Sequence, residues 1–169
     1  ASATDALSGV DYSEVRVTGG AWSLQKILSD GVYDLEARAG DLAGNATSTS
    51  ELIRIDTKSP VSLFTSHTSN EVVAGIVNLQ GLSSDMLSGL NVVEVSTDGG
   101  FTWNTATRSG GAWSYDWETT TLQNGTYTVK MRAMDVAGNR ENPISLTLLV
   151  DNFPPHVKVT DSWWIWESG

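Results

Sequence analysis

The feature that most constrains the fold of this chain is an internal repeat of about 95 residues. Five short motifs from the first 60 residues return later in the same order. The offset between partners grows from 80 residues for the first pair to 95 for the last, so the copies are collinear and indicate a duplicated unit. The pairs are DALSGV (5–10) and DMLSGL (85–90), GGAWS (19–23) and GGAWS (110–114), DGVY (30–33) and NGTY (124–127), AGDLAGN (39–45) and AMDVAGN (133–139), and ID (55–56) and VD (150–151), the last two followed by Pro60 and Pro155.

The copies are unequal in length. Residues 61–155 form a complete unit, whereas residues 1–60 lack the first part of one. Residues 156–169 follow Pro155 as the start of the complete unit follows Pro60, so they are expected to begin a further repeat. The offset jumps from 80 to 91 between the first two motif pairs, which places an extra hairpin around residues 97–101 of the complete unit.

The complete unit divides into short apolar runs separated by turn residues, a pattern typical of a β-sandwich. One run alternates clearly, because Tyr127, Val129, Met131 and Ala133 share one face and the residues between them are polar. Seven strands in one unit predict an all-β fold of tandem immunoglobulin-like, Greek-key sandwiches. The expected strands are 61–65, 72–80, 91–96, 101–107, 111–117, 126–134 and 144–150.

The order of these motifs resembles bacterial immunoglobulin-like repeats, which occur in tandem in large secreted and surface-anchored proteins. Tyr33 and Tyr127 resemble the corner tyrosine of such domains, whose hydroxyl bonds back to the preceding loop. The chain departs from antibody domains, since Leu35 and Val129 stand where the second cysteine would be. The resemblance implies a sandwich without an antibody-type core, in an extracellular or cell-surface bacterial protein.

Composition removes several function classes. The formal net charge is −10, which argues against binding to nucleic acid or to anionic membrane surfaces. The chain has no Cys, so disulfides and cysteine metal sites are absent, and no apolar run is long enough for a transmembrane helix. It begins at Ala1 without a signal-like region, and we expect it to be a processed or excised segment.

Catalytic motifs are also missing from the sequence. His67 and His156 are the only histidines, and there is no nucleophile elbow, His-x-x-x-His pair or phosphate-binding glycine loop. An enzyme is therefore not predicted, and no catalytic residue or cofactor is assigned.

Two interpretations of the repeated AGN loops remain open. In the first, Asp caps the backbone while Gly and Asn adopt positive φ, which is ordinary turn chemistry. In the second, the loops and the Asp residues at the unit boundaries bind calcium, a hard cation that prefers such oxygens. The boundaries resemble the acidic, Pro-terminated linkers of cadherins, although further acidic ligands of that pattern are missing. The candidate calcium ligands are Asp41, Asn45, Asp56, Asp135, Asn139 and Asp151.

The tryptophans suggest burial rather than sugar stacking. Trp22 and Trp113 are equivalent in the repeat and are expected in a core or corner. Trp163, Trp164, Ile165 and Trp166 would alternate between the two faces of a strand, so they are expected to pack in a core or at an interface between domains.

The incomplete first copy and the apolar tail are complementary defects. A sandwich without its first strands has an open core and an unpaired edge. Residues 156–169 are the kind of segment that residues 1–60 lack, so we hypothesise that the tail completes them, within one chain or in the next molecule. The alternative is that the chain is a fragment of a longer array of repeats, in which the tail completes nothing.

The sequence therefore predicts a non-enzymatic structural repeat of a surface protein, stalk, adhesin or filament. Its expected partners are neighbouring repeats or copies of itself, with no insertion into a membrane. The alternative is an accessory module of a secreted enzyme that binds a ligand such as a glycan.

Overall fold

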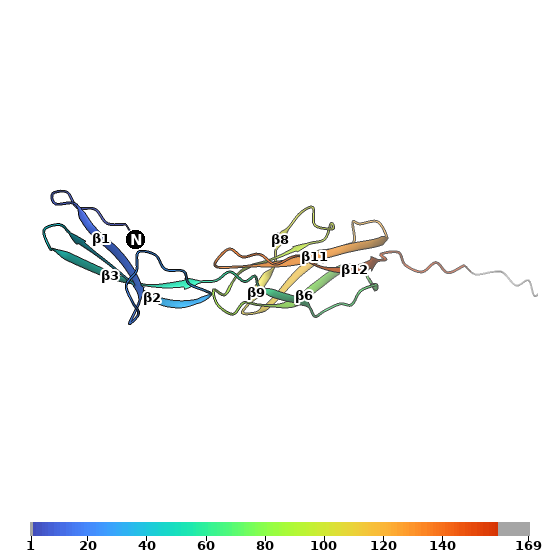
Figure 1. The fold of residues 1–169 in the computed structure, drawn as a ribbon. Helices are drawn as coiled ribbons and strands as arrows, with labels where there is room; N and C mark the ends of the chain where they lie inside the picture. The colour runs from blue at the N-terminus through green and yellow to red at the C-terminus, as the bar shows by residue number, and fades with distance from the viewer. Residues whose placement is uncertain (1, 159–169) are drawn as a thin grey trace, which may run out of the picture.

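The computed structural model describes residues 2–158, which form strands and no helix (Figure 1). Accordingly, no helix in this part of the chain is long and apolar enough to cross a membrane. The strands are β1 (Val10–Val17), β2 (Gly31–Asp41), β3 (Ala46–Ile55), β4 (Val61–Phe64), β5 (Glu71–Val73), β6 (Ile76–Ser84), β7 (Leu90–Ser96), β8 (Asn104–Thr105), β9 (Thr107–Ser109), β10 (Ala112–Glu118), β11 (Gly125–Asp135) and β12 (Ile144–Val150).

Strands β4 to β12 form a sandwich of two sheets, with orders β4-β6-β10-β9 and β5-β12-β11-β7-β8. Alternation along β6 and β11 gives each sheet one apolar face, and these faces form the core. Two aromatic pairs lie edge to face in it, Phe64 with Trp113 at 5.5 Å and Trp117 with Tyr127 at 5.7 Å between ring centroids. The immunoglobulin-like sandwich predicted for the complete unit is confirmed.

Two of the predicted strands were wrong because each is divided between the two sheets. The expected strand 72–80 breaks near Gly75, which has φ +70°. The part before the break, β5, pairs with β12, and the part after it, β6, pairs with β4 and β10. The expected strand 101–107 likewise separates into β8, which pairs with β7, and β9, which pairs with β10. An apolar run does not reveal where a chain changes sheets.

Two predicted turns are confirmed. Tyr33 and Tyr127 donate hydrogen bonds from their hydroxyls to the carbonyls of Ser29 (3.1 Å) and Gln123 (2.9 Å), as expected for the corner before β2 and β11. The extra hairpin around residues 97–101 is organised by Asp98, whose carboxylate accepts the Thr102 N–H at 2.9 Å. Hydrogen bonds from the Thr102 hydroxyl first, and then from the Thr102 N–H and the Ser96 hydroxyl, lower the pKa of Asp98.

Strands β1, β2 and β3 form a separate three-stranded sheet, called the N-terminal sheet below. In Figure 1 the N-terminal sheet extends from one end of the sandwich, and the chain passes from β3 into the first strand of the sandwich, β4. Its register repeats that of β7, β11 and β12, since Tyr33 pairs with Ile53 as Tyr127 pairs with Leu148. Within the described residues no second sheet covers it.

The core position predicted for Trp113 is confirmed, whereas Trp22, predicted in a core or a corner, does not lie in a core and is only partly buried. Trp113 is 3% exposed in the sandwich core. Trp22 instead lies against the guanidinium groups of Arg16 and Arg38, whose carbons are 4.4 and 4.3 Å from its ring centroid. In the sandwich, β6 pairs with the strand of Trp113, and β6 has no described counterpart beside the N-terminal sheet. Trp22 therefore lies on the face of the N-terminal sheet that carries Arg16 and Arg38.

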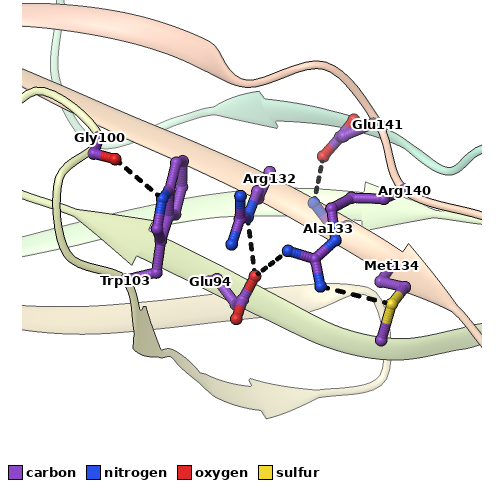
Figure 2. Close-up of polar contacts among 8 residues, drawn as sticks. All are labelled: Glu94, Gly100, Trp103, Arg132, Ala133, Met134, Arg140 and Glu141. Atoms are coloured by element: carbon purple, nitrogen blue, oxygen red, sulfur yellow. Dashed lines mark hydrogen bonds and ion pairs between the residues drawn. The ribbon is translucent and has the colours of Figure 1, made fainter.

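The position that Trp22 takes is the one that Trp103 takes in the sandwich. Figure 2 shows Trp103 beside Arg132, with 3.8 Å between its ring centroid and the guanidinium carbon, and Glu94 bonded to the same arginine at 2.8 Å. Arg38 and Glu14 form the equivalent ion pair at 2.7 Å. Both sheets therefore carry a tryptophan–arginine–glutamate cluster on the equivalent face, which in the sandwich points away from the core.

Candidate functional site

The most concentrated group of functional side chains lies where the N-terminal sheet meets the sandwich. Asp56 follows β3, Asp85 follows β6 and Asp135 ends β11. Carboxylate oxygens of all three lie within 4.8 Å of one another. We call these three residues the acidic junction.

Two loops of the sandwich hold Asp85 and Asp135 in place. Asp85 Oδ1 accepts the N–H groups of Leu87 at 3.2 Å and Gly89 at 2.7 Å. Asp135 accepts the backbone N–H and the side-chain amide of Asn139, both at 2.8 Å. The Val136 N–H donates to the Gly89 carbonyl at 2.9 Å, which joins the two loops. Each carboxylate is therefore oriented by hydrogen bonds within its own loop and does not depend on Asp56 for its position.

Asp56 reaches across the boundary and contacts both loops. Its Oδ2 accepts the Ser88 N–H at 2.9 Å, and its carbonyl accepts the Asn139 side-chain amide at 3.0 Å. Its Oδ1 accepts the Lys58 N–H at 3.1 Å. The Ser88 side chain first, and then the Lys58 and Ser88 N–H groups, lower the pKa of the Asp56 carboxyl, so it is ionised at neutral pH.

The acidic junction carries negative charge without a paired cation. None of the ion pairs among residues 2–158 includes Asp56, Asp85 or Asp135. Three carboxylates at this spacing repel one another, and a hard divalent cation would relieve that repulsion. Three carboxylates together with nearby carbonyls and water could supply the six to eight oxygens that calcium takes.

The structure brings together only some of the predicted calcium ligands. Asp56, Asp135 and Asn139 meet at the acidic junction. Asp41 and Asn45 bond to each other in the loop between β2 and β3, and that bonding lowers the pKa of Asp41. Asp151 follows β12 and is hydrogen-bonded to Asn124. The predicted interface residues Trp163, Trp164, Ile165 and Trp166 lie outside the described residues.

Asp85 is the member of the acidic junction that sequence reasoning missed. Its motif was visible as a repeat marker, since Asp5 and Asp85 open the same DxLSG pattern. Its proximity to Asp135 depends on the contact between Val136 and Gly89, which joins residues far apart in the chain. The repeat of an acidic residue beside Ser-Gly could have added it to the candidate set.

Comparison with known proteins agrees with this fold. Residues 83–152 match the family model of the bacterial Ig-like domain, which confirms the predicted resemblance for that part of the chain. No curated protein matches the chain. The fibronectin(III)-like modules of CbhA from Clostridium thermocellum align with a TM-score of 0.56 and 17% identity over 94% of this chain and 88% of theirs. This similarity supports the immunoglobulin-like sandwich.

Two glycan-related structures align more weakly. The endo-β-1,4-mannanase from Thermotoga petrophila has a TM-score of 0.49 and 14% identity over 58% of this chain and 21% of the mannanase. The Bacteroides ovatus protein SGBP-B, solved with a mixed-linkage heptasaccharide, has a TM-score of 0.30 and 14% identity over 82% of this chain and 39% of its own.

Proposed function

We propose that this chain is a non-enzymatic structural repeat of an extracellular bacterial surface protein, in which successive Ig-like units are held in line by the acidic junction. The observation that carries the proposal is the double contact of Asp56 with the loops at Ser88 and Asn139. One residue directly after the last strand of the first unit thus engages two loops of the next unit, one between β6 and β7 and one between β11 and β12.

The connection leaves little room for hinge motion. Only residues 56–60 separate β3 from β4. Asp56 is held at its carboxylate and its carbonyl, and Pro60 is buried and has a fixed φ. A short linker with both ends fixed transmits orientation from one unit to the next, which is what a spacer or stalk requires.

We also propose that the acidic junction binds calcium and is stiffened by it. Support comes from the three carboxylates within 4.8 Å and from the absence of a paired Lys or Arg among the described residues. Calcium titration by calorimetry should give a heat that Asp85→Asn abolishes and Asp34→Asn, the same charge change on an exposed residue of β2, leaves unchanged. An equal response from both variants would contradict binding at this site.

The stiffness of the junction can be measured by spin labelling, because the chain has no Cys of its own. Nitroxides at Ser50 on β3 and Thr107 on β9, both exposed, should give a narrow distance distribution. Asp56→Ala should broaden it, and Asp151→Ala, the matched position at the other end of the sandwich, should not. A broad distribution in the unaltered pair would refute the spacer role.

Assembly by strand complementation is the finer part of this proposal. One face of the N-terminal sheet is open, and a groove of about 350 Å³ runs over Ser13, Ala37, Ala39 and Thr49. An exposed sheet edge is a site at which a strand from another segment can be added. Light scattering across concentration should show higher species that deletion of 156–169 removes, and a strict monomer in every condition would count against it.

The alternative of a glycan-binding module receives less support from the described residues. A sugar platform needs an exposed aromatic face. Trp113 and Trp117 are buried in the core, and the rings of Trp22 and Trp103 lie against arginine guanidinium groups. These four tryptophans pack in the core or stack on arginines of the same chain, which favours the structural role.

A further inference from the structure

The free end of the N-terminal sheet carries the same two loops as the acidic junction. Asp5 Oδ2 accepts the N–H groups of Leu7 at 3.2 Å and Gly9 at 2.7 Å, the distances found at Asp85. Asp41 accepts the backbone and side-chain N–H groups of Asn45 at 2.8 Å, as Asp135 does from Asn139. We call residues 5–9 and 41–45 the free loops, and residues 85–89 and 135–139 the occupied loops.

The two pairs of loops differ at the two donors that Asp56 uses. In the occupied loops, the Ser88 N–H donates to Asp56 at 2.9 Å. In the free loops, the equivalent Ser8 N–H donates to its own Asp5 at 2.8 Å. The Asn139 amide bonds to Asp135 and to the Asp56 carbonyl, whereas the Asn45 amide bonds within the described residues to Asp41 alone. One chain thus displays both a docked and an undocked form of the same surface.

The opposite end of the chain presents the matching donor segment. Asp151 follows β12 as Asp56 follows β3, each after an aliphatic residue of the last strand. Asp151 Oδ1 accepts the Phe153 N–H at 3.2 Å, as Asp56 Oδ1 accepts that of Lys58 at 3.1 Å. Asp151 is exposed, and no hydrogen bond within residues 2–158 reaches its Oδ2. The equivalent oxygen of Asp56, its Oδ2, is the one that accepts the Ser88 N–H at the acidic junction.

We infer that the free loops bind the Asp151 end of a second copy of this chain. In this contact the Ser8 N–H leaves Asp5 and donates to Asp151 Oδ2, and the Asn45 amide donates to the Asp151 carbonyl. The inference rests on the proposed spacer function and extends its junction from the occupied loops to the equivalent free loops. Because the two surfaces differ, the contact is heterologous and adds copies head to tail.

The contact joins three carboxylates, Asp5, Asp41 and Asp151, which correspond to Asp85, Asp135 and Asp56. Without the covalent linker that raises the local concentration at the acidic junction, two hydrogen bonds give only weak association, so calcium should strengthen it. The measurement must therefore detect complexes in the millimolar range.

The test is a dilution series of the full chain followed by amide NMR, from about 2 mM to about 0.05 mM, because an exchange-averaged shift reports weak binding in this range. It is run once with calcium and once with EDTA. The Ser8 backbone amide and the Asn45 side-chain amide should shift with concentration in at least one condition. Ser88 and Asn139 are already engaged by Asp56 and serve as internal controls that should not shift.

Variants separate this contact from other association. Asp151→Asn should suppress the shifts of Ser8 and Asn45 several-fold, whereas Asp34→Asn makes the same charge change on an exposed residue and should leave them unchanged. The inference is overturned if Ser8 and Asn45 do not respond in either condition, or if the shifts fall instead on Leu35 and Ile53. Such a result would leave the spin-label test of the acidic junction unaffected, so the two proposals fail separately.

Discussion

The N-terminal sheet and the larger sheet of the sandwich have the same register but very different burial. Val129, Leu148 and Val150 are 0% exposed. Their repeat counterparts Leu35, Ile53 and Ile55 have equivalent pairings but stay partly exposed. The corner tyrosines and the Asp–Asn loops are also alike in both. Strand pairing and turn geometry are thus specified within one sheet, whereas burial requires the second sheet.

The comparison also explains the tryptophans of the repeated GGAWS motif. In the sandwich the segment continues as β10 and pairs with β6, where Trp113 lies opposite Gly81. A Cβ on Gly81 would lie 2.3 Å from the Trp113 ring, so glycine makes room for it. In the N-terminal sheet the same motif bridges to the edge of β1 through Val15 and Ser23. Identical local sequence adopts two positions because its partner strand differs.

The largest expected contrast is between the two tryptophans. Trp113→Ala removes a buried ring from the core and should lower the free energy of unfolding of the sandwich by about 3–5 kcal/mol. Trp22→Ala removes only a stack on arginines and should cost the N-terminal sheet about 0.5–1 kcal/mol. Urea unfolding followed by the fluorescence of the remaining tryptophans measures the first, and hydrogen exchange of β1 and β2 measures the second. Equal costs would show that Trp22 is a core residue.

A second contrast uses equivalent positions in paired strands. Leu148→Ala leaves a cavity in the closed core and should cost about 2–5 kcal/mol. Ile53→Ala truncates a partly exposed side chain in the same register and should cost less than about 1 kcal/mol, since little cavity forms. Differential hydrogen exchange reports each sheet separately. If Ile53→Ala were as costly as Leu148→Ala, the N-terminal sheet would be covered in solution.

A buried carboxyl gives a third, smaller contrast, since it joins the two sheets of the sandwich. Glu141 Oε1 accepts the Ser62 hydroxyl at 2.5 Å and the Ala133 N–H at 2.6 Å (Figure 2 shows the latter). Glu141→Ala removes the acceptor of the buried Ala133 N–H, whereas the Ser62 hydroxyl keeps Ser83 as a partner at 2.8 Å, and the change should cost about 1–3 kcal/mol. Chemical denaturation at pH 7 measures this cost. An unchanged midpoint would mean that water replaces the carboxylate.

The pH dependence of this group has a defined sign. Burial raises the pKa of Glu141 above its ordinary value near 4.5, because desolvation outweighs the two hydrogen bonds. The part of the stability that depends on protonation of Glu141 is therefore complete below the pKa of the unfolded chain and is lost as the pH rises through the raised pKa of the folded chain. Relative to Glu141→Gln, the unaltered protein should gain stability as the pH falls from neutrality towards the ordinary pKa of 4.5. Parallel pH profiles for the two proteins would contradict this.

Sequence reasoning succeeded where the determinants are local and failed where they depend on tertiary contacts. The alternation of Tyr127 to Ala133 and the hairpin at Asp98 depend on neighbours in the chain, and the structure has both. The sheet change near Gly75, the outward position of Trp22 and the approach of Asp85 to Asp135 depend on segments distant in sequence. The repeat could have identified Asp85 as a candidate residue, because Asp5 and Asp85 open the same DxLSG motif.

The most direct test of the account is the hydrogen-exchange rate of the Ser88 amide. In the unaltered chain this N–H is bonded across the boundary to Asp56, while the equivalent Ser8 N–H is bonded within its own loop. We predict that Asp56→Ala accelerates Ser88 exchange until it approaches the Ser8 rate, and that the Ser8 rate is unchanged. If Ser88 exchange is the same with and without the Asp56 carboxylate, the junction does not hold the two units together.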